Sequence, residues 1–339
     1  MTLLPSDLEN RLARAMQGAF PLEEDPWSAL GAPLGLSPTQ VLAQARAWHA
    51  EGKLREVSAV LEGAALGWDS ALVAGAVPAE RIEEVAAAVN RHPTVTHNYQ
   101  RDHRYNLWFT IAVPPEMSLE RTLEHLARES GVERFLPLRR TATFKIGVNF
   151  DLARLRSLTA ARPLAEPPRV RLGEDERRLA RALQAPLPLV REPFAALAEG
   201  KGFSSEALLA FARAHRGGLI RRYVATFRHR RLGVRGNGMS VWRLSPDRLA
   251  EIGPHLAAVP EVSHCYARNP IPGFPYTAYA MIHGPDRASV RAVAARLSRE
   301  LGVSDYALLF SVREFKKTRL RYFLPELEVW WAEREGVRA

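Results

Sequence analysis

Cysteine is almost absent from this chain of 339 residues, because Cys265 is the only one. A single thiol cannot form an internal disulfide, which suits a reducing compartment. The sequence also lacks an uninterrupted apolar run of about 18 residues, the length needed to span a membrane. Its first residues lack the basic and apolar regions of a signal peptide. We therefore expect a cytoplasmic protein with no membrane partner.

Basic residues are scarce in the first part of the chain. Residues 1–160 contain 17 Lys and Arg against 19 Asp and Glu, whereas residues 161–339 contain 30 against 18. The net charge of +10 therefore comes entirely from the second part. A positive field of this kind attracts nucleic acid, anionic lipid or a small molecule with several carboxylates. An Arg-rich solvated surface is the alternative explanation.

The chain contains one pattern twice. With a shift of 167 residues, "HPTVTHNYQR" aligns with "VPEVSHCYAR", which pairs His97 with His264, Tyr99 with Tyr266 and Arg101 with Arg268. An internal repeat of this length indicates two homologous halves, and we expect these halves to pair within one chain. The segment between them is rich in proline and polar residues, which is typical of a linker.

Each half has the same predicted order of elements. Apolar residues at helical spacing predict short helices in residues 6–62 and 174–227. Ser37 followed by Pro38 is typical of the start of a helix. Strand, helix, two strands, helix and strand follow in both halves. The predicted fold class is α+β, with two homologous halves that each contain a helix-turn-helix (winged-helix-like) unit and a ferredoxin-like βαββαβ domain. The predicted boundaries are 1–66 for the first helix-turn-helix unit, 67–155 for the first ferredoxin-like domain, 156–172 for the linker, 173–231 for the second helix-turn-helix unit, 232–327 for the second ferredoxin-like domain and 328–339 for a C-terminal tail.

Four motifs carry a resemblance to a known family. They are "HNYQRDHRYNLWFT" at 97–110, "SHCYARNPIPGFPYTAYAMIHG" at 263–284, "FKIGVNF" at 144–150 and "VREFKKTRLRYF" at 312–323. The order of domains resembles the Lrp/AsnC family of transcription regulators, and the motifs resemble its sirohaem decarboxylase branch in a fused, two-half form. Thr277 departs from the pattern of that branch, which has Asn there.

The resemblance implies a reaction. It implies a carboxy-lyase that removes two acetate carboxyl groups from sirohaem, giving 12,18-didecarboxysirohaem in haem d1 or alternative haem biosynthesis. Sirohaem, an iron tetrapyrrole, is then the substrate. The macrocycle can delocalise the charge left by loss of carbon dioxide, so we expect that no separate cofactor is required.

The candidate catalytic residues are His97, His264 and Tyr99. On a strand, residues two and four positions apart share a face, so His97, Tyr99 and Arg101 point together, as do the matching residues of the second half. Histidine can donate a proton near neutral pH or ligate haem iron, and the sequence leaves both roles open for His97 and His264. The candidate substrate-binding residues, offering aromatic walls and cations for carboxylates, are Arg101, His103, Arg104, Tyr105, Trp108, Lys145, Tyr266, Arg268, Lys316 and Lys317.

Several alternatives accompany this interpretation. His103 and Arg104 can equally lie in a solvated turn, the three lysines can be surface charges, and His283 can be a hydrogen-bonding residue at a strand end. The unequal turns, "DHR" in the first half and "NPIPGFP" in the second, indicate that His97 and His264 have unequal roles. Cys265 points away from His264, so we expect it in the core.

Two other functions compete with decarboxylation. One is an Lrp/AsnC-type DNA-binding transcription regulator, and the other is a haem-binding sensor that uses the same site without turnover. The first predicted recognition helix, "PTQVLAQARAWHAEG", has one Arg and no Lys, which is a poor supply of charge for phosphates. We therefore expect no specific nucleic-acid partner. The sequence does not determine whether fused chains form a homo-oligomer.

Overall fold

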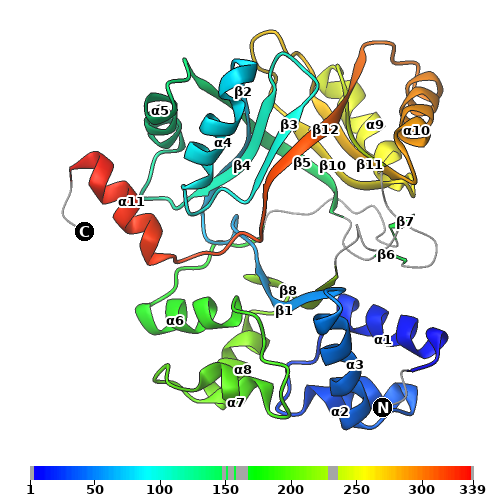
Figure 1. Ribbon diagram of the computed structural model, residues 1–339, viewed down its shortest axis with the longest axis vertical. Helices are drawn as coiled ribbons and strands as arrows, with labels where there is room; N and C mark the ends of the chain where they lie inside the picture. The colour runs from blue at the N-terminus through cyan, green and yellow to red at the C-terminus, as the bar shows by residue number, and fades with distance from the viewer. Residues whose placement is uncertain (1–3, 147–149, 152–155, 158–166, 228–235, 337–339) are drawn as a thin grey trace. The chain divides into compact units, whose positions relative to one another are not determined.

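The computed structural model describes residues 4–146, 150–151, 156–157, 167–227 and 236–336 (Figure 1). Contacts divide the chain into two compact units. The first unit contains both helix-turn-helix segments, chiefly residues 1–66 and 166–233. The second contains both βαββαβ segments, chiefly residues 67–150 and 234–339. Equivalent parts of the two halves are therefore packed together.

The first unit is built from two matching sets of three helices. The set from the first half is α1 (Ser6–Gly18), α2 (Pro26–Gly31) and α3 (Pro38–Ala50), with a 3-10 turn at Ala32–Leu34, and the second half provides α6 (Glu174–Leu183), α7 (Pro193–Ala198) and α8 (Ser205–Ala214). Ser37 caps α3 as predicted, since its hydroxyl accepts from the Gln40 amide while the Gln40 side chain accepts from the Ser37 amide. This reciprocal capping satisfies backbone groups that the helix itself cannot pair.

The prediction of helices was wrong for the ends of both segments. Residues 54–62 and 220–227 contain the strands β1 (Leu54–Leu61) and β8 (Ile220–Phe227), which form an antiparallel two-stranded sheet. Their β-branched and aromatic residues, including Val57, Val60 and Tyr223, suit a pleated and half-buried surface. A strand of the first half thus pairs with its equivalent from the second.

The second unit contains the predicted βαββαβ order twice. The first copy is β2 (Asp69–Gly75), α4 (Ile82–Asn90) after a 3-10 turn at Ala79–Arg81, β3 (His97–Arg101), β4 (Leu107–Val113), α5 (Leu119–Ser130) and β5 (Phe135–Ile146). The second copy is β9 (Gly236–Trp242), α9 (Pro246–Ala258), β10 (Val262–Arg268), β11 (Ala278–Gly284), α10 (Arg287–Glu300) and β12 (Tyr306–Lys317). A further helix, α11 (Pro325–Glu335), follows, and two-residue strands β6 (Phe150–Asp151) and β7 (Arg156–Ser157) lie between the copies.

The strands of both copies close into one barrel. Their order is β10-β11-β9-β12-β3-β4-β2-β5, so the last strand of each copy pairs with the second strand of the other, through β12–β3 and β5–β10. The predicted pairing of the halves within one chain is therefore confirmed. Helices α4 and α5 cover the outside of the first copy, and α9 and α10 cover the second (Figure 1).

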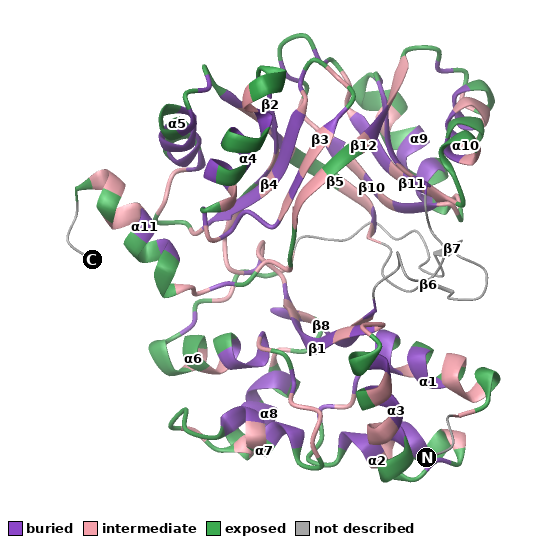
Figure 2. Ribbon diagram, viewed as in Figure 1, coloured by how far each residue is buried: buried purple, intermediate pink, exposed green. Residues whose placement is uncertain are grey.

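Two kinds of core follow from this closure. Each copy has an apolar core between its strands and its own helices, which includes Phe109 in the first copy and Ile282 in the second. A third cluster lies on the inner face of the barrel and draws residues from both copies, among them Trp108, Leu138, Met239, Tyr279 and Leu309. Figure 2 shows strands β2, β4 and β11 largely buried, whereas β3 and β12 include partly exposed segments.

Candidate active site on the inner face of the barrel

The inner face carries the predicted His, Tyr and Arg residues of both halves. On β3, His97 lies opposite Thr110 and Tyr99 lies opposite Trp108. On β10, Tyr266 lies opposite Tyr279 in the same way. Residues opposite each other on paired strands share a face, and Trp108 and Tyr279 belong to the inner cluster. The structure therefore places both predicted sets on the inner face.

Each histidine is oriented by a neighbouring hydroxyl. Nδ1 of His97 lies 3.1 Å from Oγ1 of Thr96, which is 2.8 Å from Oγ1 of Thr110. Nδ1 of His264 lies 2.8 Å from Oγ of Ser263. Each imidazole also packs near the following tyrosine ring, with centroids 6.2 Å apart for His97 and Tyr99 and 6.1 Å apart in the second half. In both halves Nδ1 is thus the ring nitrogen held by a hydroxyl.

Arg101 and Arg268 are held inside the barrel by the opposite half. Nη1 of Arg101 donates to the carbonyl oxygen of Leu309 at 3.1 Å, and Nη1 of Arg268 donates to that of Leu138 at 2.7 Å. Burial lowers the pKa of each guanidinium to about 10. Among the described residues no carboxylate bonds to either group, and the Nε atoms of both are buried without a partner. The buried guanidinium of Arg101 and the half-buried one of Arg268 therefore remain available for an anionic ligand, which would offset their desolvation.

The predicted ligand-binding residues of the first hairpin are packed against the longer hairpin of the second half. The Tyr105 hydroxyl donates to the Pro272 carbonyl oxygen at 2.6 Å, and the Arg104 guanidinium lies 4.9 Å from the Tyr105 ring centroid. The fully buried Phe274 lies 5.1 Å from the His103 ring and 5.3 Å from the Trp108 ring. Burial, followed by the charge of Arg104, lowers the pKa of His103. Tyr105 and Trp108 are therefore walls of a packed cluster rather than open surfaces.

Two of the three predicted lysines do not lie on the inner face. Lys145 is opposite Cys265 and donates to the Val259 carbonyl oxygen, at the end of α9, at 3.1 Å. Lys316 is opposite Asn98 and donates to the Asn90 carbonyl oxygen, at the end of α4, at 2.7 Å. Burial lowers the pKa of both ammonium groups. Each lysine thus caps a helix of the opposite half, where a cation is favoured by the helix dipole.

Lys317 is placed differently. It lies opposite His97 in the pairing of β12 with β3, and it is exposed. Of the three lysines, this is the one whose position agrees with a role beside His97. Cys265 lies in the helix-side core, as predicted, and burial raises its thiol pKa to about 12.

Sequence reasoning missed several residues that shape the site. Phe274 fills the inner cluster, and its signal was its place in the longer turn of the second half. Ser263 connects His264 with His283. Thr277, which departs from the family pattern, bonds the backbone of Leu244 through its hydroxyl, whereas Asn106 bonds the backbone of Val77 through its amide. Thr277 and Asn106 therefore make equivalent pairs of hydrogen bonds to the backbone.

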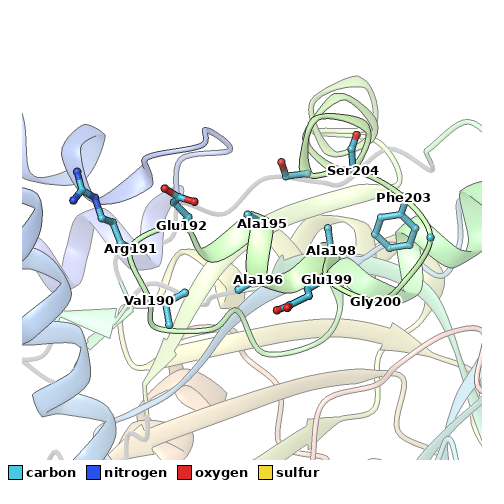
Figure 3. A pocket seen from close by; sticks show the side chains of 12 residues that line it. Val190, Arg191, Glu192, Ala195, Ala196, Ala198, Glu199, Gly200, Phe203 and Ser204 are labelled. Carbon is cyan, nitrogen blue, oxygen red and sulfur yellow. The ribbon is translucent and has the colours of Figure 1, made fainter.

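The helix-turn-helix unit also has open hollows. A hollow of about 700 Å³ in the helix-turn-helix unit is lined by α7 and its flanking loops, including Arg191, Glu192 and Ser204 (Figure 3). None of the predicted site residues lines it. Within the described ranges, no cluster of three or more His, Cys, Asp or Glu could hold a metal ion. No helix in those ranges is long and apolar enough to cross a membrane.

The repeated fold and site define a class of protein. A family model described as "AsnC-like ligand binding domain" matches residues 65–145 and 231–316. A second, described as "Siroheme decarboxylase NirDL-like HTH domain", matches residues 9–55 and 176–221. The chain is therefore a doubled protein of the AsnC-like class, with a helix-turn-helix unit and a ligand-binding domain in each half, as the sequence predicted.

Similarity over almost the whole chain identifies the family. A "Siroheme decarboxylase" of Hydrogenobacter thermophilus is 38% identical over 96% of this chain and 97% of its own. The "Siroheme decarboxylase NirDL subunit" of Paracoccus pantotrophus is 35% identical over 92% and 96%. A crystal structure of siroheme decarboxylase NirDL in complex with an iron-uroporphyrin III analogue aligns with a TM-score of 0.77 at 34% identity, covering 97% of this chain and 99% of the other. This chain belongs to the siroheme decarboxylase family, in its fused form.

Proposed function

We propose that this protein is a carboxy-lyase that removes the two acetate carboxyl groups of sirohaem, giving 12,18-didecarboxysirohaem and two molecules of carbon dioxide. The observation that carries the proposal is the pair of arginines on the inner face, one buried and one half-buried. Arg101 and Arg268 each lie four residues after a histidine, and neither bonds a carboxylate among the described residues. A substrate with several carboxylates supplies the missing negative charge.

The chemistry requires a proton donor and a dry, positively charged site. Loss of carbon dioxide leaves an electron pair on a methylene carbon, which must gain a proton to become a methyl group. The pyrrole ring delocalises this pair, so the reaction needs no separate cofactor. In the proposal, His97 and His264 are the candidate proton donors and Tyr99 supports His97. Arg101, Arg268 and Lys317 bind carboxylates, and His103, Arg104, Tyr105, Trp108 and Tyr266 shape the binding site. Lys145 and Lys316 have no binding role.

Mass spectrometry of the pigment tests the proposal. The purified protein should convert sirohaem, without oxygen and without added cofactor, into a species that has lost two carboxyl groups. Tight binding with no change in mass would instead favour a haem-binding sensor. His97 or His264 as an axial ligand of the substrate iron is the other role open to these residues, and a shift in the visible spectrum of bound pigment on their replacement would reveal it.

Three further expectations stay predictions. They are the predicted domain boundaries, the cytoplasmic location, and the absence of a specific nucleic-acid partner; whether fused chains form a homo-oligomer stays open. A regulator of the Lrp/AsnC type is not favoured by the described residues, because Arg46 of α3 and Arg213 of α8 bond within the protein. A recognition helix binds DNA phosphates through free cationic side chains. Nε of Arg46, on α3, instead donates to the Leu189 carbonyl oxygen at 2.8 Å.

A further inference from the structure

Two imidazoles of the second half are joined by one buried hydroxyl. Oγ of Ser263 lies 2.8 Å from Nδ1 of His264 and 2.6 Å from Nε2 of His283. Ser263 is 1% exposed, so bulk water does not compete for these bonds. In the described part of the first half, the corresponding hydroxyl, on Thr96, bonds Nδ1 of His97 and the hydroxyl of Thr110 rather than a second imidazole.

Local backbone geometry brings the three side chains together. Val262 pairs with Ile282 and His264 pairs with Met281, so Ser263 is an extra residue on β10. A bulge of this kind re-aims side chains beside functional sites, and here Ser263 and His264 come within hydrogen-bonding distance of each other. On β11, His283 lies two residues after Met281 and hence on the same face. The bulge and the strand period together build the chain of hydrogen bonds.

The Ser263 hydroxyl can donate only one proton, so the hydrogen bonds from His264 through Ser263 to His283 can run in only two directions. In one, His264 Nδ1–H donates to Ser263, and Ser263 donates to Nε2 of His283. In the other, the order is reversed and Nδ1 of His264 carries no proton. An imidazolium carries protons on both nitrogens, and a neutral imidazole is too weak an acid to protonate carbon efficiently near neutral pH. Only the first direction is therefore compatible with His264 as a proton donor.

We propose that His283 is a positioning residue for decarboxylation, which acts through Ser263 to keep a proton on Nδ1 of His264 and leaves Nε2 as the nitrogen that delivers a proton to the substrate. This inference rests on the proposed function and deepens it. It also gives a structural reason for unequal roles of His97 and His264. Among the described residues, a chain of hydrogen bonds that ends on a second imidazole is found in the second half alone.

The proposed step balances in atoms and charge. The bond between the acetate methylene and its carboxylate breaks, carbon dioxide leaves, and the electron pair stays on the methylene carbon. The Nε2 proton of the His264 imidazolium then forms the new C–H bond, and His264 becomes neutral with its proton on Nδ1. A proton from water restores the imidazolium for the second carboxyl group. Ser263 and His283 keep their protons throughout.

Four variants test the chain. Ser263→Ala removes the hydroxyl and His283→Leu removes its acceptor, whereas Ser263→Thr keeps a hydroxyl and His283→Gln keeps an acceptor, its amide oxygen. We expect Ser263→Ala and His283→Leu to lower kcat by about 10-fold or more, because a misoriented general acid loses much of its usual contribution. KM should change by less than about twofold, since neither residue is proposed to bind carboxylates. Ser263→Thr and His283→Gln should recover most of the loss.

The control is His255→Leu, an exposed histidine on α9 of the same half whose Nδ1 bonds the Glu251 carbonyl oxygen; its kcat should equal that of the wild type. Unchanged kcat in Ser263→Ala and His283→Leu would overturn the positioning role, as would a loss that the conservative variants do not recover. A shifted visible spectrum of bound pigment in Ser263→Ala would make His264 an iron ligand and overturn its role as donor. Wild-type protein that leaves the pigment mass unchanged would instead refute the proposed function, and this inference with it.

Discussion

The hydroxyl of Tyr105, in the first half, donates a hydrogen bond of 2.6 Å to the carbonyl oxygen of Pro272, in the second. This bond joins the short hairpin of one half to the long hairpin of the other. Phe274, two residues after Pro272, is thereby held among aromatic rings from both halves. The packing makes the inner face unequal at its two ends, although the strands that build it are equivalent.

Phe274→Ala should therefore destabilise the protein. Removal of a fully buried Phe typically costs about 3–5 kcal/mol, since it forfeits apolar burial and leaves a cavity. Urea unfolding measures the change. Val312→Ala is the control, because Val312 is 55% exposed and should change stability by less than about 0.5 kcal/mol. Equal stabilities of the two variants would show that the long hairpin does not contribute to the packed core.

Replacement of Lys145 or Lys316 should lower stability, whereas replacement of Lys317 should weaken ligand binding. Lys145→Met and Lys316→Met each remove a charged donor from a helix end, which should cost about 1.5–3 kcal/mol of stability and leave the affinity for an iron-uroporphyrin analogue unchanged. Lys317→Met should weaken binding by about fivefold, as an exposed charge contributes up to about 1 kcal/mol. Spectroscopic titration with the analogue measures the affinity. Weaker binding in Lys145→Met or Lys316→Met would restore the role that the sequence suggested for them.

His92 should make stability depend on pH. Burial, followed by the charges of Lys316 and Arg334, lowers its pKa from 6.5 to about 3. Between these values the unfolded chain binds a proton and the folded protein does not, so stability is lost as pH falls below about 6.5. At pH 5 the loss from this residue is about 2 kcal/mol. His92→Gln should reduce the difference in unfolding free energy between pH 7 and pH 5 by that amount. The exposed His255→Gln should not, and equal effects of both would contradict the assignment.

The helix-turn-helix unit should not bind DNA specifically. Arg46 of α3 and Arg213 of α8 each donate to a carbonyl oxygen in the other half, those of Leu189 and Leu22. Gln44 of α3 is buried and donates to Glu9. Residues that could contact bases or phosphates are thus used to hold the unit together. Gel-shift titration at physiological salt should show only weak and steeply salt-dependent retardation, and a protected site at nanomolar concentration would overturn this prediction.

The sequence predicts the repeat, because the two halves align directly. It also predicts the order of elements and the shared face of His97, Tyr99 and Arg101, because these depend on strand and helix periods that hold locally. It does not predict the positions of Lys145 and Lys316. Extra residues at Phe144 and Phe315 form bulges in β5 and β12, and a shift of one residue moves a side chain to the opposite face. The bulge at Ser263, which creates the contact with His283, could not be predicted either, because the strand period alone does not show an extra residue.

The closure of the barrel and the contact between the two hairpins could not be predicted from local sequence patterns either. Pairing of β12 with β3 and of β5 with β10 depends on edges from different halves, and each half alone satisfies the βαββαβ pattern. The segment "NPIPGFP" predicts a turn, but the burial of Phe274 depends on its neighbours in the other half. Long-range packing of this kind leaves no period in the sequence.

Replacement of both inner-face histidines tests the central claim most directly. Wild-type protein and the double variant His97→Ala/His264→Ala should be incubated anaerobically with sirohaem, and the mass of the extracted pigment followed with time. The account predicts loss of two carboxyl groups with the wild type and a rate lower by about 10²-fold or more with the double variant, while the variant still folds and binds the pigment. A double variant that releases both carboxyl groups at the wild-type rate would contradict it, and the chemistry would then belong to another part of the protein.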